Sequence, residues 1–155
     1  MTALAVGDRI EPFEGVNQFG QSAIIGAGGP WLVFVYPFAF TGICSSELRA
    51  LQEAQQRLAH AGCKLAAVSC DAMFSLRVFA DDERFTFSLV SDHWPHGEIA
   101  RKFGVFDERR GCALRGSFVL DADHTVRWRV VHDLGQPRDV TDHVAAVEEL
   151  VGRRK

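Results

Sequence analysis

The residues in this chain best suited to chemistry lie where a buried strand gives way to a helix. An apolar run from Trp31 to Tyr36 stops at Pro37, and a helical pattern begins at about Cys44. The start of a helix presents unpaired backbone N–H groups and the positive end of the helix macrodipole, and both favour a thiolate over a thiol. Because the thiolate is the nucleophilic form of cysteine, this position predicts a reactive sulfur at Cys44.

Three neighbours of Cys44 have side chains that suit such a sulfur. Thr41 belongs to the same turn and has a hydroxyl that both donates and accepts hydrogen bonds. Pro37 restricts the backbone where the strand ends and shields one side of the turn. Glu47 follows one helical turn later, where its carboxylate can hold an arginine in place. For an isolated cysteine the alternative is a buried structural thiol, because free cysteine is among the most buried residue types.

The spacing of these residues resembles a known signature. Pro37-x-x-x-Thr41-x-x-Cys44 resembles the PxxxTxxC motif of the peroxiredoxins, and Glu47 matches their usual acidic residue three positions later. The tracts FAFTGIC and SDHWPHG are similar to the alkyl hydroperoxide reductase E group of one-cysteine peroxiredoxins. The resemblance implies that Cys44 attacks hydrogen peroxide, an organic hydroperoxide or peroxynitrite and becomes a sulfenic acid. It also implies a supporting role for Pro37, Thr41 and Glu47.

The elements that must position this junction follow from hydrophobic periodicity and from turn residues. A strand–helix–strand unit with short connections implies parallel strands and a right-handed crossover. The element order predicts an α/β, thioredoxin-like fold with a central mixed sheet, helices on both faces and an N-terminal hairpin extension. We expect a single domain over residues 1–155. The predicted elements are a hairpin within 8–25, strands at 31–36, 64–70 and 85–90, helices at 44–61, 72–84, 98–103 and 140–151, and a hairpin of strands 116–120 and 126–131.

Arg115 is the second residue with chemical potential. It immediately precedes the strand 116–120, which in this fold lies beside the central strand, so its guanidinium can approach Cys44. Arginine is always charged and forks toward two acceptors, which suits it to stabilise a thiolate and orient a peroxide oxygen. The alternative is a surface arginine at a strand end. The tract R-G-S-F-V-L-D resembles the peroxiredoxin R-x-x-F-x-x-D tract and favours the functional interpretation.

The remaining cysteines bear on how a sulfenic acid would be reduced. Position 49, where an in-helix resolving cysteine would stand, is Arg49, and no Val-Cys-Pro motif occurs near the C-terminus. These two observations favour reduction by an external low-molecular-weight thiol, or by a glutaredoxin-like or thioredoxin-like protein. We predict that Cys63 is a packed thiol. Cys70, at the active-site edge of its strand, and Cys112, in a polar loop where it is exposed, remain alternative resolving partners.

Composition limits the other classes of function. The chain has 155 residues, of which 47% are hydrophobic and 24% charged, as in one ordinary domain with a sizeable core. A formal charge of −3 without a dense basic run argues against nucleic-acid binding. No apolar stretch approaches the roughly 20 residues that span a bilayer, and the N-terminus lacks a signal-peptide pattern, so we expect a cytoplasmic protein.

We expect neither a cofactor nor a metal. His93 and His96 are close in sequence, but Pro95 separates them and no further ligand pattern completes a site. The family resemblance implies a homodimer, with the loops around Phe38 and Trp94 as contact surfaces.

Two alternatives to a peroxidase use sulfur chemistry as well. A peroxide sensor would oxidise Cys44 once, without turnover, and excess thiol distinguishes it from an enzyme. A thiol–disulfide oxidoreductase is disfavoured because the chain has no CxxC pair.

Overall fold

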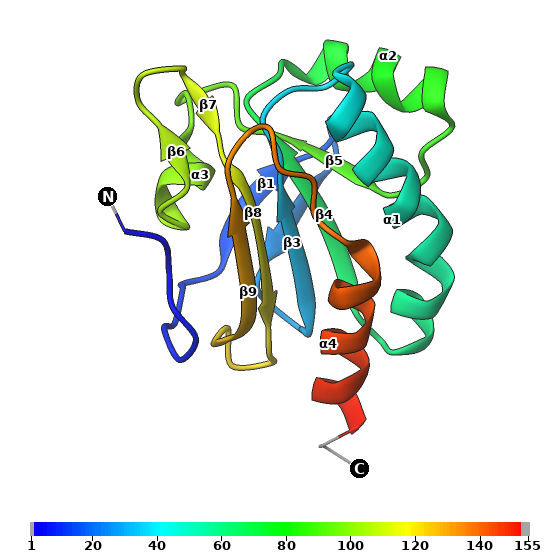
Figure 1. The fold of residues 1–155 in the computed structure, drawn as a ribbon, viewed down its shortest axis with the longest axis vertical. Helices are drawn as coiled ribbons and strands as arrows, with labels where there is room; N and C mark the ends of the chain where they lie inside the picture. Colours follow the sequence, from blue (N-terminus) through cyan, green and yellow to red (C-terminus); the bar gives the residue numbers. More distant parts are fainter. Residues whose placement is uncertain (1, 153–155) are drawn as a thin grey trace.

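The structure is a computed structural model that describes residues 2–152, and Figure 1 shows the path of the chain. A hairpin precedes alternating strands and helices, and the second half adds short strands, a hairpin of longer strands and a closing helix. The elements are β1 (Phe13–Val16), β2 (Ser22–Ile25), β3 (Trp31–Val35), α1 (Gly42–His60), β4 (Lys64–Ser69), α2 (Met73–Glu83), β5 (Ser88–Ser91), α3 (Glu98–Lys102), β6 (Phe106–Asp107), β7 (Cys112–Ala113), β8 (Arg115–Leu120), β9 (Val126–His132) and α4 (Val140–Gly152).

A five-stranded mixed sheet forms the centre of the molecule, in the order β5-β4-β3-β8-β9. Strands β3, β4 and β5 are parallel, whereas β8 runs antiparallel to β3 and β9 antiparallel to β8. The predicted central mixed sheet is therefore confirmed. In the register between β3 and β8, Val35 lies opposite Gly116. Arg115 consequently enters the sheet at the carboxyl end of β3, where the chain leaves for α1.

The two faces of the sheet pack against different elements, as the alternation of side chains along a strand requires. Leu32 and Phe34 of β3 point into a cluster with residues of α1, α2 and α4, whereas Val33 and Val35 pack on the other face with residues of α3. Figure 1 shows α1 and α4 side by side along one face, with α3 across the sheet from them. The expectation of helices on both faces is confirmed.

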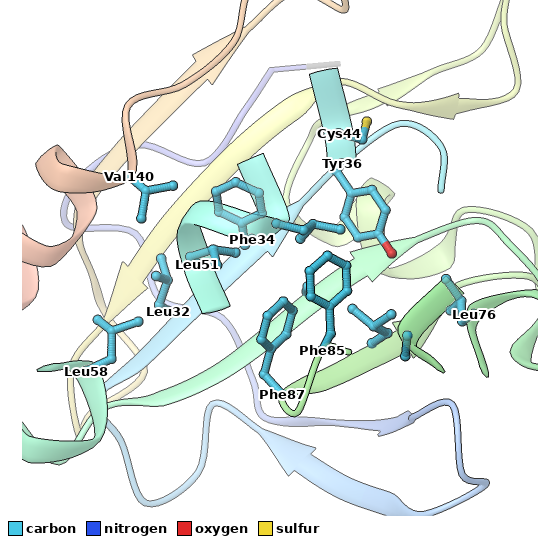
Figure 2. Packing of buried hydrophobic residues seen from close by; sticks show 14 of the residues in the cluster. Leu32, Phe34, Tyr36, Cys44, Leu51, Leu58, Leu76, Phe85, Phe87 and Val140 are labelled. Atoms are coloured by element: carbon cyan, nitrogen blue, oxygen red, sulfur yellow. The ribbon is translucent and has the colours of Figure 1, made fainter. Parts of the chain in front are cut away.

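The core on the α1 side ends close to the predicted reactive cysteine. Leu51 and Leu58 of α1 belong to the same buried cluster as Phe34 of β3 and Leu76 of α2. Figure 2 shows Cys44 at the margin of this cluster, next to Tyr36. Packing of the apolar stripe of α1 onto β3 therefore sets the position of the first turn of the helix.

The N-terminal hairpin extension is also confirmed, because β1 pairs antiparallel with β2. The turn between them depends on Asn17, whose side-chain oxygen accepts hydrogen bonds from the backbone N–H groups of Phe19 and Gln21. Asn side chains stabilise turns in this way at little conformational cost.

Three predicted segments differ from the structure by more than one residue at an end. The helix of the junction begins at Gly42, two residues before Cys44. Strand β5 begins at Ser88 rather than at 85, because pairing with β4 starts at Ser88, whereas the backbone N–H of Thr86 donates to the side chain of Gln52. The polar loop predicted around Cys112 contains the short β6–β7 hairpin.

Within residues 2–152, none of the helices is both long enough and apolar enough to cross a bilayer. The single domain over residues 1–155 stays a prediction, and Met1 and residues 153–155 lie outside the described part of the chain.

Candidate active site

Cys44 lies in the first turn of α1, as the third residue of the helix. Thr41 is the N-cap, with φ −80° and ψ 152°, and its side chain makes no capping hydrogen bond. The backbone N–H groups of a helix's first turn have no partners within the helix, so the positive end of the α1 dipole lies beside the sulfur. Cys44 exposes none of its surface. The predicted relation between the sulfur and a helix N-terminus is thus present.

Arg115 reaches Cys44, as its position in the sheet predicts. Its Nη1 atom donates hydrogen bonds to Cys44 Sγ at 3.1 Å and to Glu47 Oε1 at 2.7 Å. Its Nε atom donates to the backbone oxygen of Leu134 at 2.7 Å. The side chain is almost completely buried, so the guanidinium is held from both ends and cannot swing freely into solvent.

Glu47 binds a second arginine that sequence reasoning missed. Arg138 donates to Glu47 Oε2 from its backbone N–H at 2.8 Å and from Nε at 2.9 Å, and to Oε1 from Nη2 at 3.0 Å. Its guanidinium also lies 3.6 Å from the centre of the Phe34 ring. The local sequence Pro137-Arg138-Asp139 before a helix describes an ordinary surface arginine equally well, so no pattern in the sequence identifies this contact.

The ionisation of the Glu47 carboxyl follows from these contacts. Burial opposes its ionisation, but the hydrogen bonds and charge of Arg138, together with the charge of Arg115, outweigh burial and lower the pKa of Glu47 below its ordinary value. The buried cluster then contains two guanidinium charges and one carboxylate. One positive charge next to Cys44 is left without a carboxylate partner inside this cluster.

The loop from Pro37 to Thr41 carries the other two predicted residues. Pro37 is buried two residues after β3. Thr41 is exposed, and its hydroxyl donates to the backbone oxygen of Phe38 at 3.1 Å. Asp71, at the end of β4, holds the loop through a hydrogen bond from the backbone N–H of Ala39 at 2.8 Å. The structure therefore places Thr41 in the loop beside Cys44 but directs its hydroxyl to the backbone.

Phe40 in the same loop has φ 69°, a conformation that is unfavourable for an aromatic residue. Its ring packs 5.0 Å from that of Phe79 in α2, measured between ring centres. Such strain is frequent at functional sites and is maintained by the surrounding packing.

The other cysteines are free and buried. Burial raises the pKa of Cys63 to about 12. Burial, with the charge of Asp92 as the next contribution, raises the pKa of Cys70 to about 12. The expectation that Cys112 is exposed was wrong: β6–β7 pairing turns its side chain inward, where it is fully buried and its pKa is raised, chiefly by burial. The prediction that Cys63 is packed is confirmed.

His93 and His96 lie shortly before α3 and belong to no metal-ligand cluster among the described residues. His96 Nε2 lies 2.7 Å from the backbone oxygen of Gly111, and its ring packs against Phe106. Among residues 2–152, no group of three or more His, Cys, Asp or Glu side chains is arranged to hold a metal ion.

Comparison with known proteins places this arrangement in a family. The sequence profile of the AhpC/TSA family matches residues 6–129, which include Cys44 and Arg115. The chain belongs to this family and is a peroxiredoxin, a peroxidase enzyme. Alkyl hydroperoxide reductase E of Mycobacterium tuberculosis is 38% identical over 125 residues, which cover 79% of this chain and 81% of that protein. Alkyl hydroperoxide reductase C of Bacillus subtilis is 31% identical over 153 residues, covering 92% of this chain and 80% of its own length.

Solved structures of peroxiredoxins confirm the predicted thioredoxin-like fold. Peroxidoxin BcpB of Mycobacterium tuberculosis superimposes with a TM-score of 0.83 at 25% identity, covering 94% of this chain and 97% of its own. AhpC of Enterococcus faecalis gives a TM-score of 0.84 at 25% identity, covering 96% and 94%. The predicted similarity to the alkyl hydroperoxide reductase E group is confirmed by the 38% identity to that protein. Arg138 lies beyond the residues that the family profile matches.

Proposed function

We propose that this peroxiredoxin reduces hydrogen peroxide, organic hydroperoxides or peroxynitrite through a thiolate on Cys44. The observation that carries the proposal is the hydrogen bond of 3.1 Å from Arg115 Nη1 to Cys44 Sγ at the N-terminus of α1. Arg115, Arg138 and Glu47 leave one unbalanced positive charge in a buried cluster. Buried charges are stable only when they are paired, so a thiolate in this place balances the cluster.

The proposed reaction begins with attack of the Cys44 sulfur on one peroxide oxygen. A sulfur–oxygen bond forms and the oxygen–oxygen bond breaks. The leaving oxygen takes a proton and departs as water or an alcohol, or, when the substrate is peroxynitrite, it departs as part of nitrite. Cys44 is left as a sulfenic acid, oxidised by two electrons. Negative charge accumulates on the leaving oxygen, and preorganised N–H donors stabilise such charge most effectively.

Each supporting residue has a separate proposed role in this reaction. Arg115 and the free backbone N–H groups of α1 face the sulfur and are suited to bind the oxygens of the substrate. Glu47 holds Arg115, and Pro37 shields the sulfur from one side. We propose that the Thr41 hydroxyl donates a hydrogen bond to the peroxide. This role requires the hydroxyl to rotate away from the backbone oxygen of Phe38. Since Cys44 exposes no surface, entry of a peroxide requires a shift of the loop from Pro37 to Thr41.

We propose that an external thiol reduces the sulfenic acid. The thiol first displaces water to form a mixed disulfide with Cys44, and a second thiol then releases Cys44 and a disulfide. The donor is a low-molecular-weight thiol or a glutaredoxin-like or thioredoxin-like protein. Cys70 and Cys112 are poor alternatives because both are buried and their raised pKa values keep them protonated at neutral pH. Four free, buried cysteines also agree with the proposed cytoplasmic location, where thiols stay reduced.

We propose that the protein is a homodimer in which apolar residues near the active site of one copy cover those of another. Trp94 and Phe74 are 86% and 75% exposed. Phe38 and Phe40 are exposed in the loop before α1. Because β3 and β5 are parallel to β4, the segments that follow them leave the sheet at the same edge. A second copy of this chain presents the same apolar residues and is the occupant that we expect.

Replacement of the nucleophile tests the proposed reaction. Cys44→Ser is expected to abolish peroxide consumption because a hydroxyl is far less nucleophilic than a thiolate. The assay follows peroxide loss with excess thiol, and Cys63→Ser is the matched control because it removes another buried thiol at the opposite end of the sheet. Retention of a tenth of the parent rate by Cys44→Ser would contradict the proposal.

Mass spectrometry after one equivalent of peroxide tests how the sulfenic acid is resolved. A single added oxygen on the Cys44 peptide supports external reduction, whereas an internal disulfide identifies a resolving cysteine and overturns that part. Turnover with excess thiol separates the enzyme from a sensor, which would consume one equivalent and stop.

A further inference from the structure

A serine and a histidine form a second layer of polar contacts behind the active-site arginines. Ser117 belongs to β8 and His143 to α4, and both are buried. Ser117 Oγ lies 3.0 Å from Arg138 Nη1 and 2.7 Å from His143 Nε2. His143 Nδ1 lies 2.9 Å from the backbone oxygen of Asp139. The four groups form a continuous chain of contacts from α4 to the pair formed by Arg138 and Glu47.

The direction of each hydrogen bond in this chain follows from the chemistry of the groups. The backbone oxygen of Asp139 can only accept, so His143 Nδ1 carries a hydrogen. In a neutral imidazole, Nε2 is then an acceptor, and the Ser117 hydroxyl donates to it. The Ser117 oxygen in turn accepts from Arg138, which can only donate. Every polar atom is used, and the arrangement requires a neutral His143.

The surroundings of His143 keep the ring neutral. It packs between the rings of Phe34 and Trp128, at 5.3 and 4.9 Å between ring centres. Burial lowers the pKa of His143 to about 4, and the charge of Arg138 contributes in the same direction. The hydrogen bond to the Asp139 backbone and the charges of Glu47 and Asp139 oppose this shift without cancelling it.

Ser117 determines where one N–H of Arg138 points. Arg138 Nη1 donates to the backbone oxygen of Val35 at 2.8 Å and to Ser117, while Nε and Nη2 donate to Glu47. A guanidinium is planar and rigid, so fixing one side of the fork fixes the side that binds Glu47. Without the Ser117 hydroxyl, Arg138 Nη1 keeps only the backbone oxygen of Val35 as an acceptor. One buried, charged N–H is then unpaired, which favours rotation of the fork away from Glu47.

We propose that Ser117 and His143 are positioning residues, which orient Arg138 and, through Glu47, hold Arg115 against Cys44. The inference rests on the proposed function, because it concerns the reactivity of the same sulfur. It predicts that two side chains without contact to the sulfur control how fast Cys44 reacts.

Three variants test this chain of contacts. Ser117→Ala removes the hydroxyl, and His143→Phe keeps an aromatic ring but removes the acceptor. His143→Gln retains a side-chain oxygen that can accept from Ser117 and serves as the matched control. Two rates are measured for Cys44: oxidation by hydrogen peroxide, and alkylation by iodoacetamide between pH 5 and 9 with peptide mapping. Circular dichroism and thermal unfolding report on the fold.

We expect Ser117→Ala and His143→Phe to slow both reactions by about tenfold at pH 7, the lower end of what outer-shell partners contribute at metal sites. Their alkylation profiles should move to higher pH, and His143→Gln should stay within twofold of the parent. In a Glu47→Gln background, Ser117→Ala should cause no further decrease in either rate, because the Glu47 carboxylate that links Arg138 to Arg115 is already absent.

Two results would overturn the proposal. One is a folded but less stable His143→Phe protein that reacts at the parent rate, which assigns the pair a structural role alone. The other is an undiminished effect of Ser117→Ala in the Glu47→Gln background. If Ser117→Ala does not fold, the Cys44 reaction rates of His143→Phe and His143→Gln test the proposal. Should the parent Cys44 fail to react with peroxide, the proposed function fails, while the alkylation profiles still test the positioning chain.

Discussion

At the scale of single residues, the site depends on one guanidinium nitrogen of Arg115 that donates to two acceptors. Arg115 Nη1 lies within hydrogen-bond distance of both Cys44 Sγ and Glu47 Oε1. The carboxylate holds the guanidinium in place, and Arg138 binds both oxygens of that carboxylate. The electrostatic setting of the sulfur is therefore a property of four side chains rather than of Cys44 alone.

Removal of the guanidinium should slow the enzyme without unfolding it. Arg115→Ala is expected to reduce the rate of Cys44 oxidation by about 10²–10³-fold, the loss typical of one preorganised donor. Arg115→Lys keeps the charge but cannot donate from a planar fork to two acceptors, so it should recover only part of the rate. Rapid-mixing kinetics across pH measure the effect.

Arg110→Ala is the matched control for this prediction, because Arg110 is an exposed arginine paired with Asp107. It should react like the parent. An Arg115→Ala protein with an unchanged rate-versus-pH curve would remove Arg115 from the site.

At the scale of elements, the site lies at one edge of the sheet. The carboxyl end of β3, the first turn of α1 and the start of β8 meet there, and Arg138 enters from the segment before α4. In Figure 1 the loop leading into α4 passes over this edge. Residues from α1, from the start of β8 and from the segment before α4 therefore converge on the site around Cys44.

The helix on the opposite face depends on one glycine. Gly97 precedes α3 with φ +75°, and an added Cβ would lie 2.3 Å from Cε1 of Phe106. Gly97→Ala should therefore lower the free energy of unfolding by more than about 1 kcal/mol, through both strain and overlap. Urea denaturation measures the change.

Gly135→Ala provides the comparison, because a Cβ there meets nothing within 4 Å. It should leave stability nearly unchanged. Equal effects of the two substitutions would show that backbone strain and crowding at Gly97 are unimportant.

At the scale of the whole molecule, two buried groups link stability to pH in opposite directions. His143 has a native pKa of about 4 against an ordinary value of 6.5, so the unfolded state binds the proton more tightly. Its contribution to stability is complete above pH 6.5 and is lost as pH falls toward 4. Burial raises the pKa of Asp92 from 3.8 to about 6, so its native state binds the proton more tightly and gains stability as pH falls.

Comparison with His143→Gln isolates the histidine. As pH falls from 7 to 4, the parent should lose up to about 3 kcal/mol of unfolding free energy relative to this variant, from the size of the shift. Urea denaturation of both proteins at several pH values measures the difference. A difference independent of pH would mean that His143 titrates normally in the folded protein.

The proposed dimer gives a second prediction for the whole molecule. Trp94→Asp and Phe74→Asp each place a charge on the exposed apolar surface near the site and should shift the protein to monomers in sedimentation velocity. Val6→Asp is the control, because Val6 is also exposed but lies beside Trp128 and Leu150, away from that surface. A monomeric parent, or equal dissociation by the control, would contradict the dimer.

Much of the fold could be predicted from the sequence, because it depends on local patterns. The apolar run of β3, the helical stripe of α1 and the turn at Asn17 each determine a conformation from neighbouring residues. The position of Cys44 at a helix start and of Arg115 at a strand start follows from the same patterns. The exposure of Cys112 was mispredicted because the residues from Asp107 to Arg110 before it are polar, whereas strand pairing decides which side chains turn inward.

Sequence alone determined that a cysteine stands at the start of a helix and an arginine at the start of the neighbouring strand. Only the tertiary structure decided which partners those residues have. Arg138 and Glu47 are 91 positions apart, and Ser117 and His143 are 26 apart, so no local spacing relates them. A buried charge or hydroxyl must find a partner, but which one it finds is set by the packing of α4 beside α1 and β8.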